Sequence, residues 1–144
     1  MSLLPPSTNP AYAGARASAW FLALAAVLTL VPGAIHSFAP DGGAQTIAGL
    51  DIGNRPELVR SLFAWEGATQ LALGVAMLAV ALRYRPLVPL FLSLILLERG
   101  LMALHGWVLR PPASGHHPPE HFASLIVLPI AALFLVLSLR RWRR

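Results

Sequence analysis

Three histidines and a glutamate are concentrated in residues 114–121 of this chain, which read SGHHPPEH. Imidazole and carboxylate groups can transfer protons, and they can also bind zinc or iron. Two more histidines, His36 and His105, lie elsewhere in the chain, and none of the spacings is that of a standard metal motif. His36, His105 and His121 are candidate metal ligands because histidine is a common ligand of zinc and iron. The sequence does not identify a metal or any other cofactor.

A second group of polar residues lies inside long apolar runs. Glu66 and Gln70 are four residues apart, so they share one face of a helix. Glu98 and His105 are seven apart and also share a face, whereas Arg99 points about 100° away from Glu98. An ionisable group inside a membrane span costs about 2.5–3.5 kcal/mol on insertion scales, so it normally faces a partner or a cavity.

These residues allow two interpretations. Arg99 could form an interhelical ion pair with Glu66 or Glu98, or a carboxylate could lie in a polar pocket as a proton acceptor or ligand anchor. The candidate ligand-binding residues are His36, Glu66, Gln70, Glu98, Arg99, His105 and His121, and the candidate catalytic residues are Glu66, Glu98 and His105. We expect His121 to turn inward and join His36, His105 and Glu98 at a cavity mouth, with His116 and His117 nearer to water.

The elements that position these groups follow from composition. The chain is 56% hydrophobic and only 12% charged, against about 25% charged in soluble domains. Its apolar residues form four runs, at about 17–39, 58–82, 86–107 and 120–139, and a span needs about 20 such residues. We therefore predict an all-α bundle of four transmembrane helices over residues 16–144, preceded by a disordered or extended tail, residues 1–15.

The distribution of arginine predicts the orientation. With four spans, seven arginines lie on the side of the two termini and three on the other side, and an excess of arginine favours the cytoplasm. We therefore predict that both termini are cytoplasmic. The seven are Arg16, Arg83, Arg85, Arg140, Arg141, Arg143 and Arg144, and the three are Arg55, Arg60 and Arg110. Trp20 and Trp142 then mark the inner boundary, and Trp65 and Trp107 the outer one. All five histidines fall on the outer side. The composition, rich in Ala, Leu and Gly and without lysine, suggests a bacterial inner-membrane protein.

Several classes of function are excluded or disfavoured. The chain has no cysteine, which excludes disulfides, thiolate catalysis and iron–sulfur clusters. The net charge of +5 does not indicate nucleic-acid binding, because four of the arginines follow the last apolar run, as in a cytoplasmic membrane flank. Ser37-Phe38-Ala39 resembles a signal-peptide cleavage site, but only one arginine precedes the first run, so we expect a retained helix.

The middle of the chain resembles a family. EGATQLALGVAMLAVALR, followed by LERGLMALHG, is similar to small bacterial four-helix membrane proteins of uncharacterised function that are loosely DoxX-like. The resemblance covers about residues 63–106 and implies the four-helix fold. It implies no catalytic residue, and HHPPEH departs from its pattern.

Three functions are compatible with these features. The first is an accessory subunit of a larger membrane complex, or a binder of a small lipophilic molecule, with a homo-oligomer also possible. The second is an intramembrane enzyme doing acid–base chemistry on an isoprenoid-like substrate. The third is a metal or haem site facing the periplasm. The enzyme, with Glu66 or Glu98 acting together with His105, needs a closed apolar pocket that contains the carboxylates. The subunit needs a broad lipid-facing apolar surface and no pocket, and the metal site needs at least three ligand atoms within coordination distance.

Overall fold

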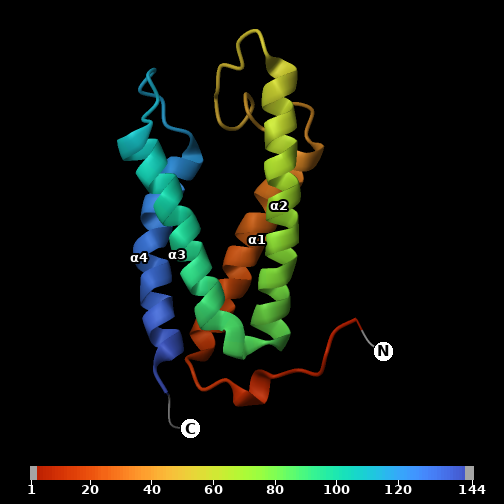
Figure 1. The fold of residues 1–144 in the computed structure, drawn as a ribbon, viewed down its shortest axis with the longest axis vertical. Coiled ribbons are helices and arrows are strands. Elements are labelled where there is room, and N and C mark those ends of the chain that lie inside the picture. Colours follow the sequence, from red (N-terminus) through yellow and green to blue (C-terminus); the bar gives the residue numbers. More distant parts are fainter. Residues whose placement is uncertain (1–2, 142–144) are drawn as a thin grey trace.

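The computed structural model describes residues 3–141, and this part of the chain is helical without strands (Figure 1). The four long helices are α1 (Arg16–Phe38), α2 (Pro56–Arg83), α3 (Val88–Leu104) and α4 (Pro119–Leu139). The short helices are η1 (Asn9–Ala11), η2 (Arg85–Leu87) and the π-helical turn η3 (His105–Leu109). Trp142, Arg143 and Arg144, which contribute to the predicted orientation, lie outside the described residues.

All four long helices are long and apolar enough to cross a membrane, which confirms that prediction. Their mean hydropathies are 2.0, 1.4, 1.9 and 2.7, where the third value covers the continuous segment Arg85–Leu109. Large apolar side chains cover the outer surface of the bundle, and Trp65 is 74% exposed. Such a surface suits lipid. The chain is therefore a multi-pass membrane protein by length and composition, with both termini at one end of the bundle and the two longer loops at the other (Figure 1).

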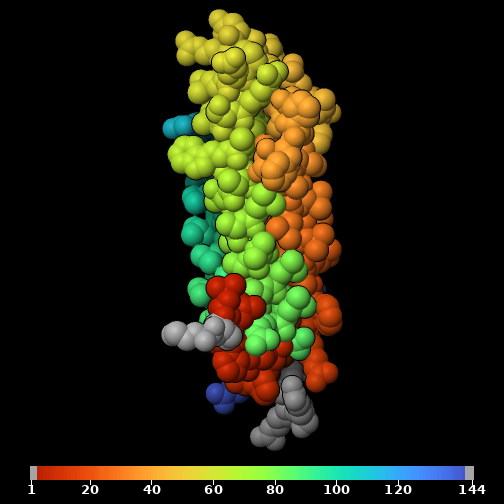
Figure 2. Space-filling model, turned by 90° about the vertical axis from the view of Figure 1, so that its right-hand side faces the viewer, coloured from red at the N-terminus to blue at the C-terminus, as the bar shows by residue number. Residues whose placement is uncertain are grey.

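Helices α1 and α2 form a tightly packed hairpin, and they lie side by side along their length in Figure 2. Glycines allow this close approach. A Cβ atom added at Gly67 would lie only 2.7 Å from the carbonyl oxygen of Gly33, and one at Gly74 would lie 2.6 Å from the Leu30 side chain. Small residues bring helix backbones together in membranes. Gly67 and Gly74 are seven residues apart, so they lie on one face of α2, and α1 packs against that face.

Helices α3 and α4 form a second hairpin, which joins the first mainly near the terminal end of the bundle. The shared core contains Leu22 of α1, Met77 of α2, Leu92 of α3 and Ala131 of α4. The Ser18 hydroxyl adds a bond by donating to the Phe134 carbonyl oxygen at 2.9 Å. Helices α2 and α3 make little contact with each other. The two hairpins are thus joined at one end, and they leave space between them toward the loop end.

The N-terminal tail is attached to the connection between α2 and α3. The Asn9 side-chain amide donates to the Leu82 carbonyl oxygen at 2.6 Å, and its side-chain oxygen accepts from the Arg85 backbone N–H at 3.1 Å. Tyr12 is buried in the core cluster. Burial raises the pKa of the Tyr12 phenol above its ordinary value, against the lowering effects of Ser18 and Arg85. The tail therefore has a defined course across the terminal end of the bundle.

Candidate functional site

A cavity of about 260 Å³ lies between the two hairpins. This volume is slightly below the ~300–1,000 Å³ that is usual for ligand pockets, so a bound molecule would be small. Residues from all four helices line it: Phe21, Ala25, Leu28, Thr29, Pro32, Gln70, Met77, Ile95, Glu98, Arg99, Met102, Pro119, Glu120, Ala123 and Val127. The cavity exists because α2 and α3 stay apart while α1 and α4 close its other sides.

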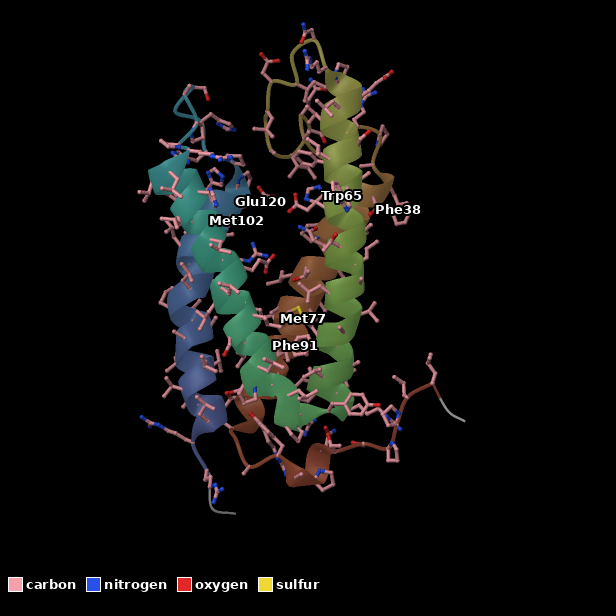
Figure 3. The ribbon with its side chains drawn as sticks, in the orientation of Figure 1. Phe38, Trp65, Met77, Phe91, Met102 and Glu120 are labelled. Carbon is pink, nitrogen blue, oxygen red and sulfur yellow. The ribbon has the colours of Figure 1, made fainter. Side chains whose placement is uncertain are left out.

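The lining of the cavity is divided by polarity. Toward the terminal end it is apolar, with Phe21, Met77 and Ile95. Toward the loop end it includes Glu98 and Glu120 together with Arg99 and Gln70. Figure 3 shows Met102 and Glu120 nearer the loops than Met77. An apolar chamber with a few polar groups at one end is the usual form of a site for an amphipathic small molecule.

Glu98 and Arg99 form a loose ion pair, with Arg99 Nε 3.8 Å from Glu98 Oε2. An Arg99 guanidinium nitrogen, Nη1, also lies 3.9 Å from the Met102 sulfur. The sequence suggested a pair joining two helices, but here both partners are neighbours on α3, so their attraction holds no two helices together. The Glu98 side chain is 35% exposed and the Arg99 side chain is 17% exposed. Although their helical directions differ, both are long enough to reach the same cavity.

Glu66 and Gln70 have different positions. The Gln70 amide nitrogen donates to Glu66 Oε1 at 3.1 Å, so the i, i+4 relation predicted from the sequence is present. Glu66 itself is exposed and does not line the cavity, whereas Gln70 does. Gln70 Oε1 is buried and has no hydrogen-bond partner within residues 3–141. Gln70 therefore brings an unused acceptor to the cavity wall.

His36 and His105 do not line the cavity. His36 is buried, its Nδ1 lies 2.6 Å from the Gly42 carbonyl oxygen, and its ring packs edge-on against Phe63. These contacts attach the first loop to the α1–α2 hairpin. His105 lies in η3 and is exposed. Both histidines are at the loop end, as the sequence indicated, but sharing a depth in the bundle does not make them converge.

His121 pairs with His117 instead, and their Nδ1 atoms are 3.0 Å apart. The His117 ring stacks on Trp107 with centroids 4.0 Å apart, and Trp107 Nε1 donates to the His121 carbonyl oxygen at 3.2 Å. The His121 ring packs against Gly106, where a side chain would not fit, since an added Cβ atom would lie 2.7 Å from the ring. In residues 3–141, no group of three or more histidine, aspartate or glutamate side chains is arranged to hold a metal.

The two loops touch above the bundle through His116. Its Nε2 lies 2.9 Å from the carbonyl oxygen of Ala48 in the first loop. A shallow groove continues below this contact, along Ile47, His117 and Phe122. His116 thus links the loops of the two hairpins, a role that sequence reasoning missed because it treated this histidine as solvated.

Glu120 is the other residue that sequence reasoning missed as part of a site. Helix α4 begins at Pro119 with Glu120 in its first turn. A glutamate at this place is favoured by the positive end of the helix dipole. The structure also places it in the cavity lining. Its position directly before an apolar run of α4 was the one available signal.

The first loop is organised by Asp41. The Asp41 carboxylate accepts hydrogen bonds from the backbone N–H groups of Gly43, Gln45 and Thr46 at 2.9, 3.1 and 2.9 Å, and from the Thr46 hydroxyl. The bond from the Thr46 backbone is the largest of the effects that lower the pKa of Asp41 from 3.8 to about 2. Because the pKa of Asp41 is lower in the folded protein, the ionised carboxylate stabilises the fold. This stabilisation is fully present above pH 3.8 and is lost as the pH falls through about 2.

We therefore expect Asp41→Asn to increase hydrogen exchange of the Gly43, Gln45 and Thr46 amides at pH 7, since a neutral amide is a weaker acceptor than a carboxylate. Exchange followed by mass spectrometry over residues 40–50 measures this. Asp51→Asn is the control, because among residues 3–141 that carboxylate accepts a hydrogen bond only from the Gly53 N–H, at 2.9 Å. Equal exchange in Asp41→Asn and wild-type protein would contradict the role assigned to Asp41.

The fold and site together define a class: a four-helix multi-pass membrane protein built of two hairpins, with an amphipathic cavity between them. No protein-family model, curated protein or solved structure matches this chain. The resemblance to DoxX-like proteins therefore stays a prediction.

Proposed function

We propose that this protein binds a small lipophilic molecule in the cavity between its hairpins. The observation that carries the proposal is the polarity of the cavity, which is apolar toward the terminal end and holds Glu98, Arg99 and Glu120 toward the loops. A molecule with an apolar body and a polar head would match both parts. Because α2 and α3 make little contact, such a molecule could enter sideways from the bilayer.

Two other functions have less support. An enzyme using Glu66 or Glu98 with His105 would need a carboxylate and the imidazole around one substrate, yet of the three residues only Glu98 lines the cavity. A purely structural subunit would need the broad apolar surface that this bundle has, but it would not need a cavity with ionisable groups. A partner complex remains compatible with binding, since the outer surface is apolar on every long helix.

Ala123→Phe tests the binding function. Ala123 lines the cavity and is exposed, so the larger side chain can occupy the space without displacing the core. We expect a photoreactive diazirine analogue of octan-1-ol, added to protein in lipid nanodiscs, to label cavity peptides of the wild type. Ala123→Phe should reduce this labelling roughly tenfold, as steric blocking of about 1.4 kcal/mol would do.

The matched control is Ala132→Phe, on the same helix, where the alanine is also exposed but lines no part of the cavity. Mass spectrometry of the labelled peptides should show no change in this variant. Labelling that is equal in both variants, or spread evenly over the lipid-facing surface, would contradict the proposed site.

We further propose that the protein lies in a bacterial inner membrane with cytoplasmic termini, so that the cavity's polar end faces the periplasm. The support is the arginine distribution: Arg16, Arg83 and Arg85 are at the terminal end, and positive residues favour the cytoplasmic side. Reporter fusions should read periplasmic at Gly43 and cytoplasmic at Arg85. A cytoplasmic reading at Gly43 would reverse the orientation and put the histidines inside the cell.

A further inference from the structure

We infer that the cavity selects molecules whose polar head is a positively charged amine, which makes its ligand a lipophilic amine. This inference rests on the proposed function and specifies the chemistry of the same site. It is carried by the charges, by the unused hydrogen-bonding groups and by their position at one end of an apolar chamber.

The charges of the lining favour a cation. Glu98, Glu120 and Arg99 are the ionisable residues that line the cavity. With both carboxylates ionised they leave one negative charge in excess. Both carboxylates are partly buried, with the Glu98 side chain 35% exposed, and a partly buried charge attracts an opposite charge more strongly than it would in bulk water. A bound ammonium would supply the missing positive charge.

The hydrogen-bonding groups of the lining also favour a cation. Arg99, the cationic donor of the lining, is already beside Glu98. The Glu120 carboxylate has no hydrogen-bond or ion-pair partner within the described residues, although the helix backbone at Glu120 accepts from Ser124. Gln70 Oε1 is also unpartnered there. The unused capacity is thus for accepting hydrogen bonds, whereas an ammonium head is a donor with three N–H groups.

Other head groups fit less well. A carboxylate or phosphate head would compete with Glu98 for Arg99 and would lie near the Glu120 charge. A hydroxyl head could donate one hydrogen bond, but it would leave the excess charge without a partner. The apolar part of the lining, Phe21, Met77, Ile95 and Val127, would hold a short hydrocarbon chain in each case. Discrimination therefore depends on the head alone.

Three photoreactive diazirine probes with the same eight-carbon chain separate these cases: an amine, an alcohol and a carboxylic acid. Each is added to wild-type protein in nanodiscs of zwitterionic lipid at pH 7, and labelling of cavity peptides is quantified by mass spectrometry. We expect the amine to label most efficiently, the alcohol less and the acid least. Efficiencies that are equal for the amine and the alcohol would overturn the inference while leaving the proposed binding function intact.

Glu120→Gln tests the residue assigned to the head group. It should reduce labelling by the amine roughly tenfold, because a hydrogen bond to a charged group is typically worth at least that factor, and should leave labelling by the alcohol unchanged. Glu57→Gln is the matched control. Glu57 follows a proline in the first turn of α2, as Glu120 does in α4, but it does not line this cavity.

The outcomes are distinct. Undiminished amine labelling in Glu120→Gln overturns the inference, and so does an equal loss in Glu57→Gln. If neither the amine nor the alcohol labels the cavity of the wild-type protein, the proposed function fails together with the inference. Amine labelling that depends on Glu120 but not on Glu57, and that Ala123→Phe also reduces, supports both.

Discussion

Gly67→Ala should destabilise the protein by about 1–3 kcal/mol, the usual cost of overpacking. The added Cβ would lie 2.6 Å from Ser37 Oγ and 2.7 Å from both the Gly33 carbonyl oxygen and the Ser37 backbone nitrogen. Two of these neighbours are backbone atoms of α1, so the new methyl group can be accommodated only if the two helices move apart. Thermal unfolding in detergent micelles measures the change.

Gly100→Ala is the matched control. Gly100 also lies inside a membrane-spanning helix, α3, but an added Cβ would meet nothing closer than Leu128 Cδ2, at 4.0 Å. Alanine has the higher helix propensity by about 1 kcal/mol, so this variant should be as stable as the wild type or more stable. If the two variants melt alike, close backbone contact is not what holds α1 and α2 together.

Leu22→Ala should cost about 2–5 kcal/mol, as is typical for leucine removed from a packed core. Leu22 is fully buried, at 0% exposure, in the cluster to which all four long helices contribute. Inside a membrane the loss is one of van der Waals contact, because lipid is as apolar as leucine. The junction between the hairpins should weaken, and labelling of the cavity between them should become less specific.

Leu24→Ala separates packing from hydrophobicity. Leu24 is two residues further along α1 and is 55% exposed, so the same change of side chain removes contacts with lipid rather than with the core. Its melting temperature should stay close to that of the wild type. A similar loss for both variants would show that the cluster around Leu22 is not the junction that the structure indicates.

The histidines show that the end of the bundle at which a residue lies can be predicted from the sequence, whereas its contacts cannot. The predicted order and orientation of the four spans placed His36, His105 and His121 at the same end of the bundle. They do not give the direction of the side chain relative to the neighbouring helices. In the structure His36 bonds the first loop, His105 is exposed and His121 pairs with His117. The three histidines therefore lie at the same end of the bundle but in three different environments.

The four membrane helices could be determined from the sequence by itself, because the thickness of a bilayer fixes the length of an apolar run that can cross it. The start of α4 at Pro119 was also local information, since proline suits the first turn of a helix. The capacity of Gly67 and Gly74 for close packing followed from their lack of a side chain. Each of these features depends on residues that are near one another in the chain.

Only the tertiary structure decided which helices pair and what lies between them. Pairing α1 with α2 and α3 with α4, joined around Leu22, leaves a cavity between the hairpins that begins at this core and runs toward the loop end. That arrangement brings Glu120 of α4 into the same cavity lining as Glu98 and Arg99 of α3, whereas Glu66 is exposed and is not part of that lining. The physical reason is rotation about the helix axis. A sequence fixes the angles between side chains on one helix, but packing against the neighbouring helices fixes which of those angles faces the interior.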